Sequence, residues 1–399
     1  MKPRLPDVSP LRHHWPLTPG MVFLNHGSYG ACPSPVIEKQ IQLRWDLDAA
    51  PVQFLHRRHT PMLDAARNEV ASFLGADPAN LVFVTNTTTG VNAVMRSLEF
   101  SPGDEILITS HGYNACNNVV REVARRTGAV IVEAGIPFPI GSPELVTEAI
   151  LSAVTPRTKL ALIDHVTSKT GLVLPLEEIL RGLEERGVET LVDGAHAPGM
   201  LPLDLESLRP SYYTANLHKW VCAPKGAAIL WVRPDRQETL QPAVISHGNN
   251  TPRPGHSAFQ DRFDWDGTHD TTAALCAPEV IRWLEGLAPG GWPEIRERNH
   301  RMVIEGRNLL CDRLGLIAPC PDSMIGSMST LPMPAGLETP HEGPDRDPVY
   351  VRLFDEFGIE LQVFPFEGRR WFRISSHLHN TPDEYRYLAD VLERMAAGR

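Results

Sequence analysis

A lysine between a histidine and a tryptophan is the first candidate for chemistry in this sequence. Lys219 stands between His218 and Trp220 in an apolar surround. Desolvation lowers the pKa of such an amine and favours the free base, which can form an imine with a carbonyl group. Lys225 is an alternative, although Gly226 beside it indicates a turn. Taken alone, Lys219 would be a surface residue in most proteins.

A threonine-rich segment supplies a candidate anion site. Residues 84–90 read Val-Thr-Asn-Thr-Thr-Thr-Gly, follow an apolar run and open a helical pattern. Hydroxyls and backbone amides at the start of a helix can hold a phosphate. A helix cap without a ligand is the structural alternative, because threonine is a preferred cap residue.

Asp193 closes the apolar run 190–193, 26 residues before Lys219. A buried carboxylate is costly unless it meets a cation or a protonated ring. The ring nitrogen of pyridoxal phosphate is such a partner, and an aspartate facing it keeps the ring protonated as an electron sink. Asp193 alone fits a helix cap or turn equally well. Together, the lysine, the aspartate and the threonine loop predict a pyridoxal-phosphate site.

A sheet whose strands end at one edge would bring these residues together. Short apolar runs alternate with longer amphipathic stretches at 88–98, 114–126 and 176–185. That alternation predicts an α/β domain with a largely parallel sheet buried on both faces, and ligands collect beyond the carboxyl ends of such strands. The expected strands are 81–84, 105–109, 129–132, 159–163, 190–193 and 227–232.

The predicted division has three units: an N-terminal arm 1–20, a cofactor-binding large domain 21–290, and a small α+β domain 291–399. The large domain includes an irregular active-site excursion, 233–290, which Phe259, Phe263 and Trp265 favour over a flexible tether. In the small domain we expect strands near 359–364 and 371–375 and a mobile loop at 332–348.

Composition restricts the partners. The 48 acidic and 38 basic side chains give a formal charge of -10, which disfavours nucleic acid and anionic membranes as partners. Six scattered cysteines show neither a metal knuckle nor a disulfide framework, which favours a reducing, cytoplasmic location. No run of 18 apolar residues and no export signal is visible, so membrane spanning is not expected.

Other motifs carry little chemistry. The stretch His56-Arg57-Arg58-His59 could suggest a metal pair, but two guanidiniums would repel a cation, and no metal site is predicted. Gly194 and Gly199 have the spacing of a phosphate-binding Walker loop without its lysine.

Over residues 21–381 the sequence resembles the class V aminotransferase family, which has the fold of type I pyridoxal-phosphate enzymes. An aspartate at a strand end, a His-Lys pair about 26 residues later and a Thr-Thr loop carry the resemblance. It implies a large domain with a mostly parallel sheet and a small C-terminal α+β domain. It also implies that Lys219 forms the Schiff base and Asp193 faces the ring nitrogen. The implied phosphate ligands are Thr87, Thr88, Asn216 and His218, although Asn216 stands where the family usually has Ser or Thr. His196 takes the place of a glutamine that contacts the ring hydroxyl.

Within the family, the sequence resembles isopenicillin N epimerase-like proteins through residues 23–30 (Phe-Leu-Asn-His-Gly-Ser-Tyr-Gly) and 51–58. The resemblance implies a substrate loop with Asn25 and His26 and a carboxylate-binding Arg373. It further implies that Arg57 and Arg58 reach a second acidic group, that Tyr113 stacks over the ring, and that Thr268 touches the phosphate of a second subunit. The expected assembly is therefore a homodimer with shared active sites.

The predicted reaction begins at Cα of an amino acid, the expected small-molecule substrate, with Lys219 as the base. Epimerisation or racemisation is the favoured outcome. A carbon–sulfur lyase of the cysteine desulfhydrase type and a class V aminotransferase are the alternatives. Residues 353–373 contain no cysteine, which disfavours persulfide transfer. The combination of Asp193, Lys219 and Arg373 argues against a cofactor-binding protein without activity.

Overall fold

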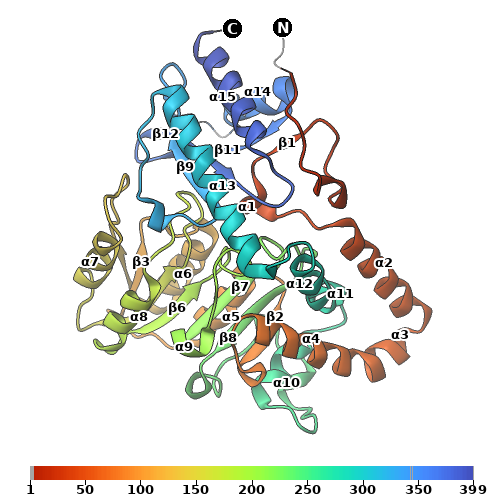
Figure 1. Cartoon of the computed structure of the whole chain (residues 1–399). Helices are drawn as coiled ribbons and strands as arrows, with labels where there is room; N and C mark the ends of the chain where they lie inside the picture. Colours follow the sequence, from red (N-terminus) through yellow and green to blue (C-terminus); the bar gives the residue numbers. More distant parts are fainter. Residues whose placement is uncertain (1–3, 342, 344, 399) are drawn as a thin grey trace.

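Short apolar runs form a seven-stranded sheet in the computed structural model, which describes residues 4–341, 343 and 345–398 (Figure 1). The ends of the predicted N-terminal arm and C-terminal unit, and two positions of the 332–348 loop, lie outside the described residues. The strands are β2 (Leu81–Val84), β3 (Glu105–Thr109), β4 (Val130–Ala134), β5 (Thr158–Asp164), β6 (Glu189–Asp193), β7 (Tyr212–Asn216) and β8 (Ala228–Val232).

The strand order is β2-β8-β7-β6-β5-β3-β4. β8 runs antiparallel to both of its neighbours, whereas the pairs from β7 to β4 are parallel. The predicted α/β class with a largely parallel sheet is therefore confirmed. The predicted strand set was incomplete, because β7 was not among the apolar runs. Its sequence, Tyr-Tyr-Thr-Ala-Asn, is buried but partly polar.

Both faces of the sheet are buried, as parallel sheets require. Successive residues of a strand point to opposite faces. Ile106 and Ile108 accordingly belong to one apolar cluster and Leu107 to the other. One cluster includes residues of α5 (Thr87–Ser97), α6 (Asn114–Thr127) and α10 (Ala258–Asp264). The other includes residues of α4 (His59–Phe73), α7 (Glu144–Ser152), α8 (Leu176–Glu184) and α12 (Ala277–Glu285).

The segment 233–290 is less irregular than predicted, because α10, α11 (Thr272–Leu275) and α12 occupy its second half. A capping box formed by Ser257 and Gln260 begins α10. Phe259 and Phe263, one turn apart, then bury one face of that short helix.

A smaller part of the chain stands above the large sheet in Figure 1. Its antiparallel sheet has the order β11-β12-β9, formed by β9 (Met328–Pro332), β11 (Gln362–Phe366) and β12 (Arg369–Ser375). β9 was not predicted. The helices of this part are α13 (Gly291–Leu314), α14 (Pro348–Phe357) and α15 (Pro382–Ala396).

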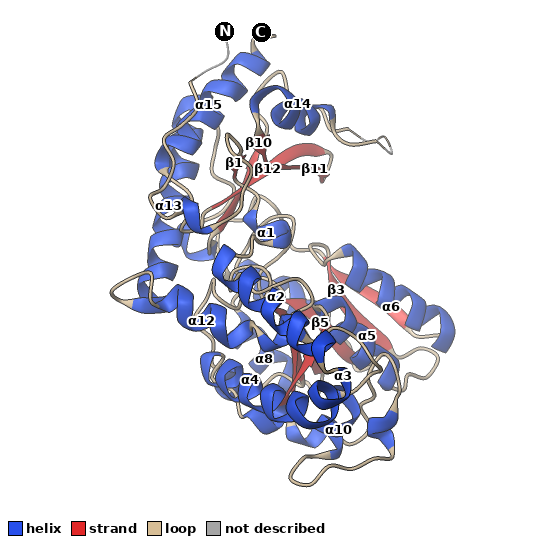
Figure 2. Cartoon of the chain, turned by 90° about the vertical axis from the view of Figure 1, so that its right-hand side faces the viewer, coloured by secondary structure: helices blue, strands red, loops and turns tan. Residues whose placement is uncertain are grey.

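The N-terminal segment is built into this smaller part. β1 (Val22–Phe23) pairs in parallel with β10 (Ile359–Glu360), and α1 (His26–Tyr29) follows it. Figure 2 shows α1 between the smaller part and the large sheet. The chain then reaches α4 through α2 (Ser34–Ala49), α3 (Pro51–Gln53) and the π-helical turn Phe54–Arg58. In the large domain, the short helix α9 (Leu205–Leu208) follows β6. Within the described chain, no helix is long and apolar enough to cross a membrane.

Candidate active site

A cavity of about 590 Å³ lies beyond the carboxyl ends of the strands, where ligands of open α/β sheets bind. Segments that follow β2, β3, β5, β6 and β7 line it together with α1. Its walls comprise Ser28, Tyr29, Asn86, Thr87, Thr88, Thr89, Asn92, Tyr113, Asp164, Ser168, Asp193, Ala195, His196, Asn216, His218, Lys219 and Ala243.

Lys219 follows β7 and is 9% exposed. Burial lowers the pKa of its amine to about 8, and the nearby Asp193 carboxylate opposes that shift. The amine Nζ lies 2.9 Å from Nε2 of His196. By contrast, Lys225 donates a hydrogen bond to the backbone oxygen of Gly30 at 2.9 Å and does not line the cavity. Of the two lysines, Lys219 is therefore the one placed to react there.

The backbone of Lys219 is tightly held. Its carbonyl oxygen accepts hydrogen bonds from Nε2 of His26 and from the amide of Cys222, both at 3.0 Å. Gly30, with φ +67°, lies against the same segment, and a Cβ there would be 2.1 Å from the carbonyl oxygen of His218. Glycine is therefore needed where the loop after α1 passes Lys219.

Asp193 ends β6 and is 4% exposed. Its Oδ1 accepts a hydrogen bond from the amide of Ala195 at 3.0 Å, and its Oδ2 accepts one from the thiol of Cys116 at 3.2 Å. Burial raises the pKa of Asp193. A buried carboxyl group at a strand end suits a protonated ring nitrogen, because the positive ring would offset the cost of burying the charge.

Sequence reasoning missed two neighbours of Asp193. Asp164 ends β5 in register with Asp193, lines the cavity, and has a pKa well above the ordinary value because it is buried beside Asp193. Cys116 lies on α6. The run that ends in Asp164 resembles the run that ends in Asp193, so a pair of acidic strand ends was a detectable signal. Nothing local in the sequence indicated Cys116.

The threonine loop opens α5, an 11-residue helix whose N-cap is Asn86. Asn86 Oδ1 accepts a hydrogen bond from the amide of Thr89 at 2.9 Å, and Asn216 Oδ1 accepts one from the amide of Thr87 at 3.0 Å. The cap is thus an asparagine rather than a threonine, and the hydroxyls of Thr85 and Thr89 hydrogen-bond to each other at 2.9 Å. Two buried polar atoms here, Thr87 Oγ1 and His218 Nδ1, have no hydrogen-bond partner among the described residues.

These orphaned atoms fit the predicted cofactor. Buried polar groups are normally hydrogen-bonded, and a phosphate at the N-terminus of α5 would supply acceptors beside them. The same cavity contains a low-pKa amine and a buried strand-end carboxyl group. The described residues therefore fit a phosphorylated pyridine aldehyde.

Arg373 lies on β12 and is 2% exposed. Its guanidinium donates hydrogen bonds to the backbone oxygen of Ser168, to Oδ1 of Asn25 at 3.5 Å and to Oγ of Ser28 at 3.4 Å. Burial lowers its pKa to about 9. Within residues 4–341, 343 and 345–398 no ion pair joins Arg373 to a carboxylate. A buried guanidinium without an anion is costly, and a substrate carboxylate would relieve that cost.

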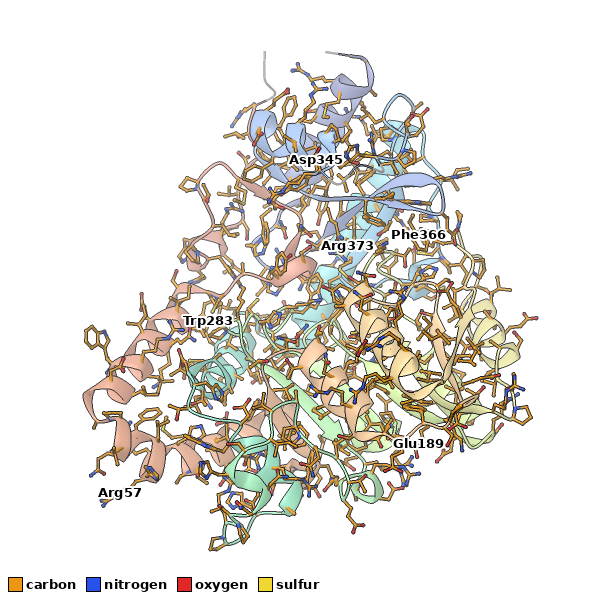
Figure 3. The ribbon with its side chains drawn as sticks, turned by 180° about the vertical axis from the view of Figure 1, so that it is seen from behind. Arg57, Glu189, Trp283, Asp345, Phe366 and Arg373 are labelled. Atoms are coloured by element: carbon orange, nitrogen blue, oxygen red, sulfur yellow. The ribbon has the colours of Figure 1, made fainter. Side chains whose placement is uncertain are left out.

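The structure brings some predicted residues to the cavity and leaves others elsewhere. Tyr113 lines it, at 46% exposure. His26 is fully buried behind Lys219, and both of its ring nitrogens contact protein atoms. Arg57 and Arg58 are exposed, and Arg58 pairs with Asp46 at 3.0 Å. Figure 3 shows Arg57 at the periphery of the molecule, far from the centrally placed Arg373.

Thr268 is also exposed and does not line this cavity in its own chain. Its loop continues into Asp270, whose Oδ1 accepts a hydrogen bond at 2.9 Å from the amide of Thr272, the first residue of α11. In this chain, therefore, neither Thr268 nor the arginine pair lines the cavity that contains Lys219.

Comparison with known proteins identifies relatives. The family model for aminotransferase class-V matches residues 24–310. An isopenicillin N epimerase of Amycolatopsis lactamdurans is 34% identical over 394 residues, which cover 95% of this chain and 96% of that protein. Putative L-cysteine desulfhydrase 1 of Oryza sativa subsp. japonica is 30% identical over 416 residues, which cover 95% of this chain and 84% of that protein.

Among solved structures, the cystine C-S lyase C-DES in complex with its product cysteine persulfide has a similar fold. The TM-score is 0.80 at 21% identity, over 94% of this chain and 97% of that chain. A variant of C-DES carries glycine covalently linked to its PLP cofactor. At this identity the likeness concerns the fold.

Proposed function

Because this chain belongs to the aminotransferase class-V family, we propose that it epimerises or racemises an amino acid at Cα. Its cofactor is pyridoxal 5'-phosphate. The observation that carries the proposal is the buried amine of Lys219, with a pKa of about 8, in the cavity. Ser28 and Ser168 line the same cavity, and both accept hydrogen bonds from Arg373. The 34% identity to an isopenicillin N epimerase over nearly the whole of both chains supports epimerisation as the outcome.

Each polar residue has a task in this proposal. When bound, the cofactor supplies an electron sink that weakens the bonds at the substrate Cα. Arg373 holds the α-carboxylate and orients Cα toward Lys219. With a pKa near 8, the Lys219 amine can both accept and return the Cα proton near neutral pH. Asp193 holds the proton of the ring nitrogen, and Thr87, Thr88, Asn216 and His218 bind the phosphate.

Epimerisation also needs a proton delivered to the opposite face of Cα. The hydroxyl of Tyr113 is the candidate donor, because this residue lines the cavity and burial raises its pKa, which keeps it protonated. Tyr29 lines the same cavity and provides a second hydroxyl.

The test is to incubate the holoenzyme with a panel of L-amino acids and to identify the products by chiral chromatography. Appearance of the D-isomer, and its absence with a Lys219→Ala variant, is the expected result. Release of pyruvate and ammonia without a D-isomer would overturn epimerisation.

That second outcome corresponds to a β-eliminating carbon–sulfur lyase, which is the second candidate. The 30% identity to a rice protein named as a putative L-cysteine desulfhydrase favours it. Transfer of a persulfide is a weaker candidate, because residues 353–373 contain no cysteine. Cysteine should be included in the substrate panel, with sulfide as the measured product.

We further propose that the working unit is a homodimer with shared active sites. Ile41 and Trp45 lie one turn apart on α2 and are 47% and 69% exposed, and Val52 on α3 is 69% exposed. Burial of these apolar side chains against a second copy would be favourable. In that assembly Thr268 would contact the partner's phosphate, and Arg57 and Arg58 the partner's substrate.

A further inference from the structure

We propose that Trp220 is a positioning residue, which fixes the tautomer of His196 so that Lys219 is held in the cavity as an uncharged amine. The three side chains form one chain of contacts. The indole Nε1 of Trp220 donates to Nδ1 of His196 at 3.3 Å, and Nε2 of His196 lies 2.9 Å from Nζ of Lys219. The inference concerns Lys219 as the cofactor lysine and does not rest on the epimerase proposal.

The hydrogen bond from Trp220 to His196 determines the direction of the hydrogen bond between His196 and Lys219. An indole N–H can only donate, so Nδ1 of His196 must be the acceptor and carries no proton. A neutral imidazole then has its proton on Nε2, and this N–H points at Nζ of Lys219. Nζ can accept that hydrogen bond only through a lone pair, which an ammonium group lacks.

The opposite arrangement is unfavourable. A charged Lys219 would donate to Nε2, so the imidazole would carry its proton on Nδ1. That proton would face the indole N–H across 3.3 Å, and two donors would meet between side chains that are 2% and 1% exposed, at the cost of an unsatisfied buried group. A doubly protonated His196 meets the same conflict. Its pKa is also well below the ordinary value, because it is buried near Lys219 and Arg373.

The indole cannot easily turn away from His196. Trp220 is 1% exposed, and its ring stacks on that of His377 with 6.3 Å between centroids and 21° between planes. The ring of His26 lies 5.2 Å away, and the backbone oxygen of Trp220 accepts a hydrogen bond from Nε2 of His377 at 3.3 Å. Because these neighbours fix both ring and backbone, the indole is a rigid donor.

The charges around Lys219 explain why a hydrogen bond from His196 can change its protonation. Charged carboxylates favour an ammonium, whereas the guanidinium of Arg373 and burial favour the free amine. The groups that face Lys219 are Asp193 from β6, Asp164 from β5, Cys116 from α6, Arg373 from β12, and the imidazoles of His196 and His218. The carboxylates and the arginine oppose one another, so a hydrogen bond given to Nζ shifts the balance toward the neutral amine.

The chemical consequence concerns capture of the cofactor. A neutral amine can attack the aldehyde carbon: a C=N bond forms, and the aldehyde oxygen leaves as water with the two amine protons. An ammonium cannot attack. Trp220 therefore acts through His196 to increase the fraction of Lys219 that is present as the neutral amine.

The test compares Trp220→Phe with Trp231→Phe, in the full-length chain from which the cofactor has been removed. Trp231 is a matched control, because it is fully buried and donates its indole N–H to Glu206 at 3.0 Å, and it does not line the cavity. The probe is pyridoxal 5'-phosphate, and the measurement is the rate of imine formation as a function of pH. We expect Trp220→Phe to raise the apparent pKa of Lys219 by about one unit, which slows capture at pH 7 about tenfold. Trp231→Phe should leave the profile unchanged.

A second readout is independent of capture. Nitrogen NMR of the 15N-histidine-labelled chain, with His196 assigned by its loss in His196→Gln, should show an unprotonated Nδ1 and a protonated Nε2. Protonation at Nδ1 in the unsubstituted chain would overturn the proposal. In a His196→Ala background, replacing Trp220 by Phe should have no further effect on the profile. Additive effects would mean that the indole acts through packing, and would likewise overturn it.

If Trp220→Phe does not fold, two substitutions at His196 carry the test. Glutamine can accept from the indole through its carbonyl and donate to Nζ through its amide, so His196→Gln should keep the wild-type pH profile. His196→Ala should shift it upward. Equal profiles in these two variants would contradict the proposal.

Discussion

The thiol of Cys116 lies 3.2 Å from Oδ2 of Asp193 and donates a hydrogen bond to it. Burial beside that carboxylate raises the pKa of the thiol, so the sulfur keeps its proton. Asp193 is thereby held by two donors, the thiol and the amide of Ala195. The carboxyl group is oriented before any ring nitrogen reaches it.

Asp193→Asn should impair catalysis more than cofactor binding, because a neutral amide cannot hold the proton of the ring nitrogen by charge. We expect a loss in kcat of hundreds-fold, or about 3 to 4 kcal/mol of barrier. Asp204→Asn is the control, since Asp204 caps α9 and does not line the cavity. Unchanged kcat in Asp193→Asn would mean that Asp193 has only a structural role.

The purified holoenzyme should be yellow, and borohydride should fix the cofactor to Lys219. Peptide mapping of the reduced protein checks this attachment. Lys219→Ala should lose all turnover while still binding the cofactor without a covalent bond, whereas Lys225→Ala should remain active and yellow. An adduct mapped to Lys225 would contradict the assignment.

Arg373→Ala should reduce kcat/KM for every amino-acid substrate alike. A substrate carboxylate left without a partner in a buried site costs roughly 2 to 5 kcal/mol. Arg370→Ala is the matched control, because Arg370 lies on the same strand but pairs with Asp347 at 2.9 Å. Wild-type constants in Arg373→Ala would exclude this residue as the carboxylate ligand.

The double variant Arg57→Ala, Arg58→Ala tests whether these exposed arginines serve a neighbouring subunit. If they bind a distal carboxylate across a dimer interface, kcat/KM should fall for acidic amino acids and hardly change for alanine. A uniform loss for both classes of substrate would contradict distal-carboxylate binding.

Stability of the cofactor-free protein should fall on acidification from pH 7 to pH 5. Burial lowers the pKa of several histidines below the unfolded value of about 6.5, so the unfolded chain binds more protons as the pH falls through 6.5 and is favoured. Burial raises the pKa of Asp164, Asp193 and Glu384, and a hydrogen bond to Asp266 raises the pKa of His269. These four groups oppose the trend but are fewer than the histidines with lowered pKa values. Thermal unfolding followed by circular dichroism checks the direction, and a Tm that rises between pH 7 and pH 5 would contradict it. The histidines are His26, His111, His165, His196, His218, His377 and His379.

The sequence could predict those parts of the site that depend on local patterns. Asp193 ends an apolar run and the threonine loop follows another, and the rule that ligands collect at strand ends places these two together. Lys219 was a candidate because of its own apolar neighbours, since the strand before it, β7, is partly polar and was not predicted. Their catalytic roles remain predictions. The family and the fold class are confirmed. Both could be predicted because a set of motifs and an alternation of strands and helices can be read directly from the linear sequence.

Contacts between distant segments could not be predicted in this way. The thiol of Cys116 reaches Asp193 from a helix on one face of the sheet, and the indole of Trp220 reaches His196 because the chain turns after β7. In both contacts the two residues lie far apart in the sequence, so the periodicity of a helix or a strand does not predict that they meet. Likewise, the exposure of Arg57 depends on where α2 and α3 extend from the molecule, as Figure 1 shows.

The pairing of β1 with β10 joins Val22 to Ile359, so β1 is synthesised long before its partner strand. During translation the seven strands of the large sheet can emerge and pair while β1 still has no partner. The loop that carries Asn25 and Gly30 can settle against Lys219 and Arg373 only after residues 359–375 have left the ribosome. A nascent chain would therefore hold most of the phosphate-binding residues but no substrate pocket, so catalysis has to wait until residues 359–375 have been synthesised and have folded.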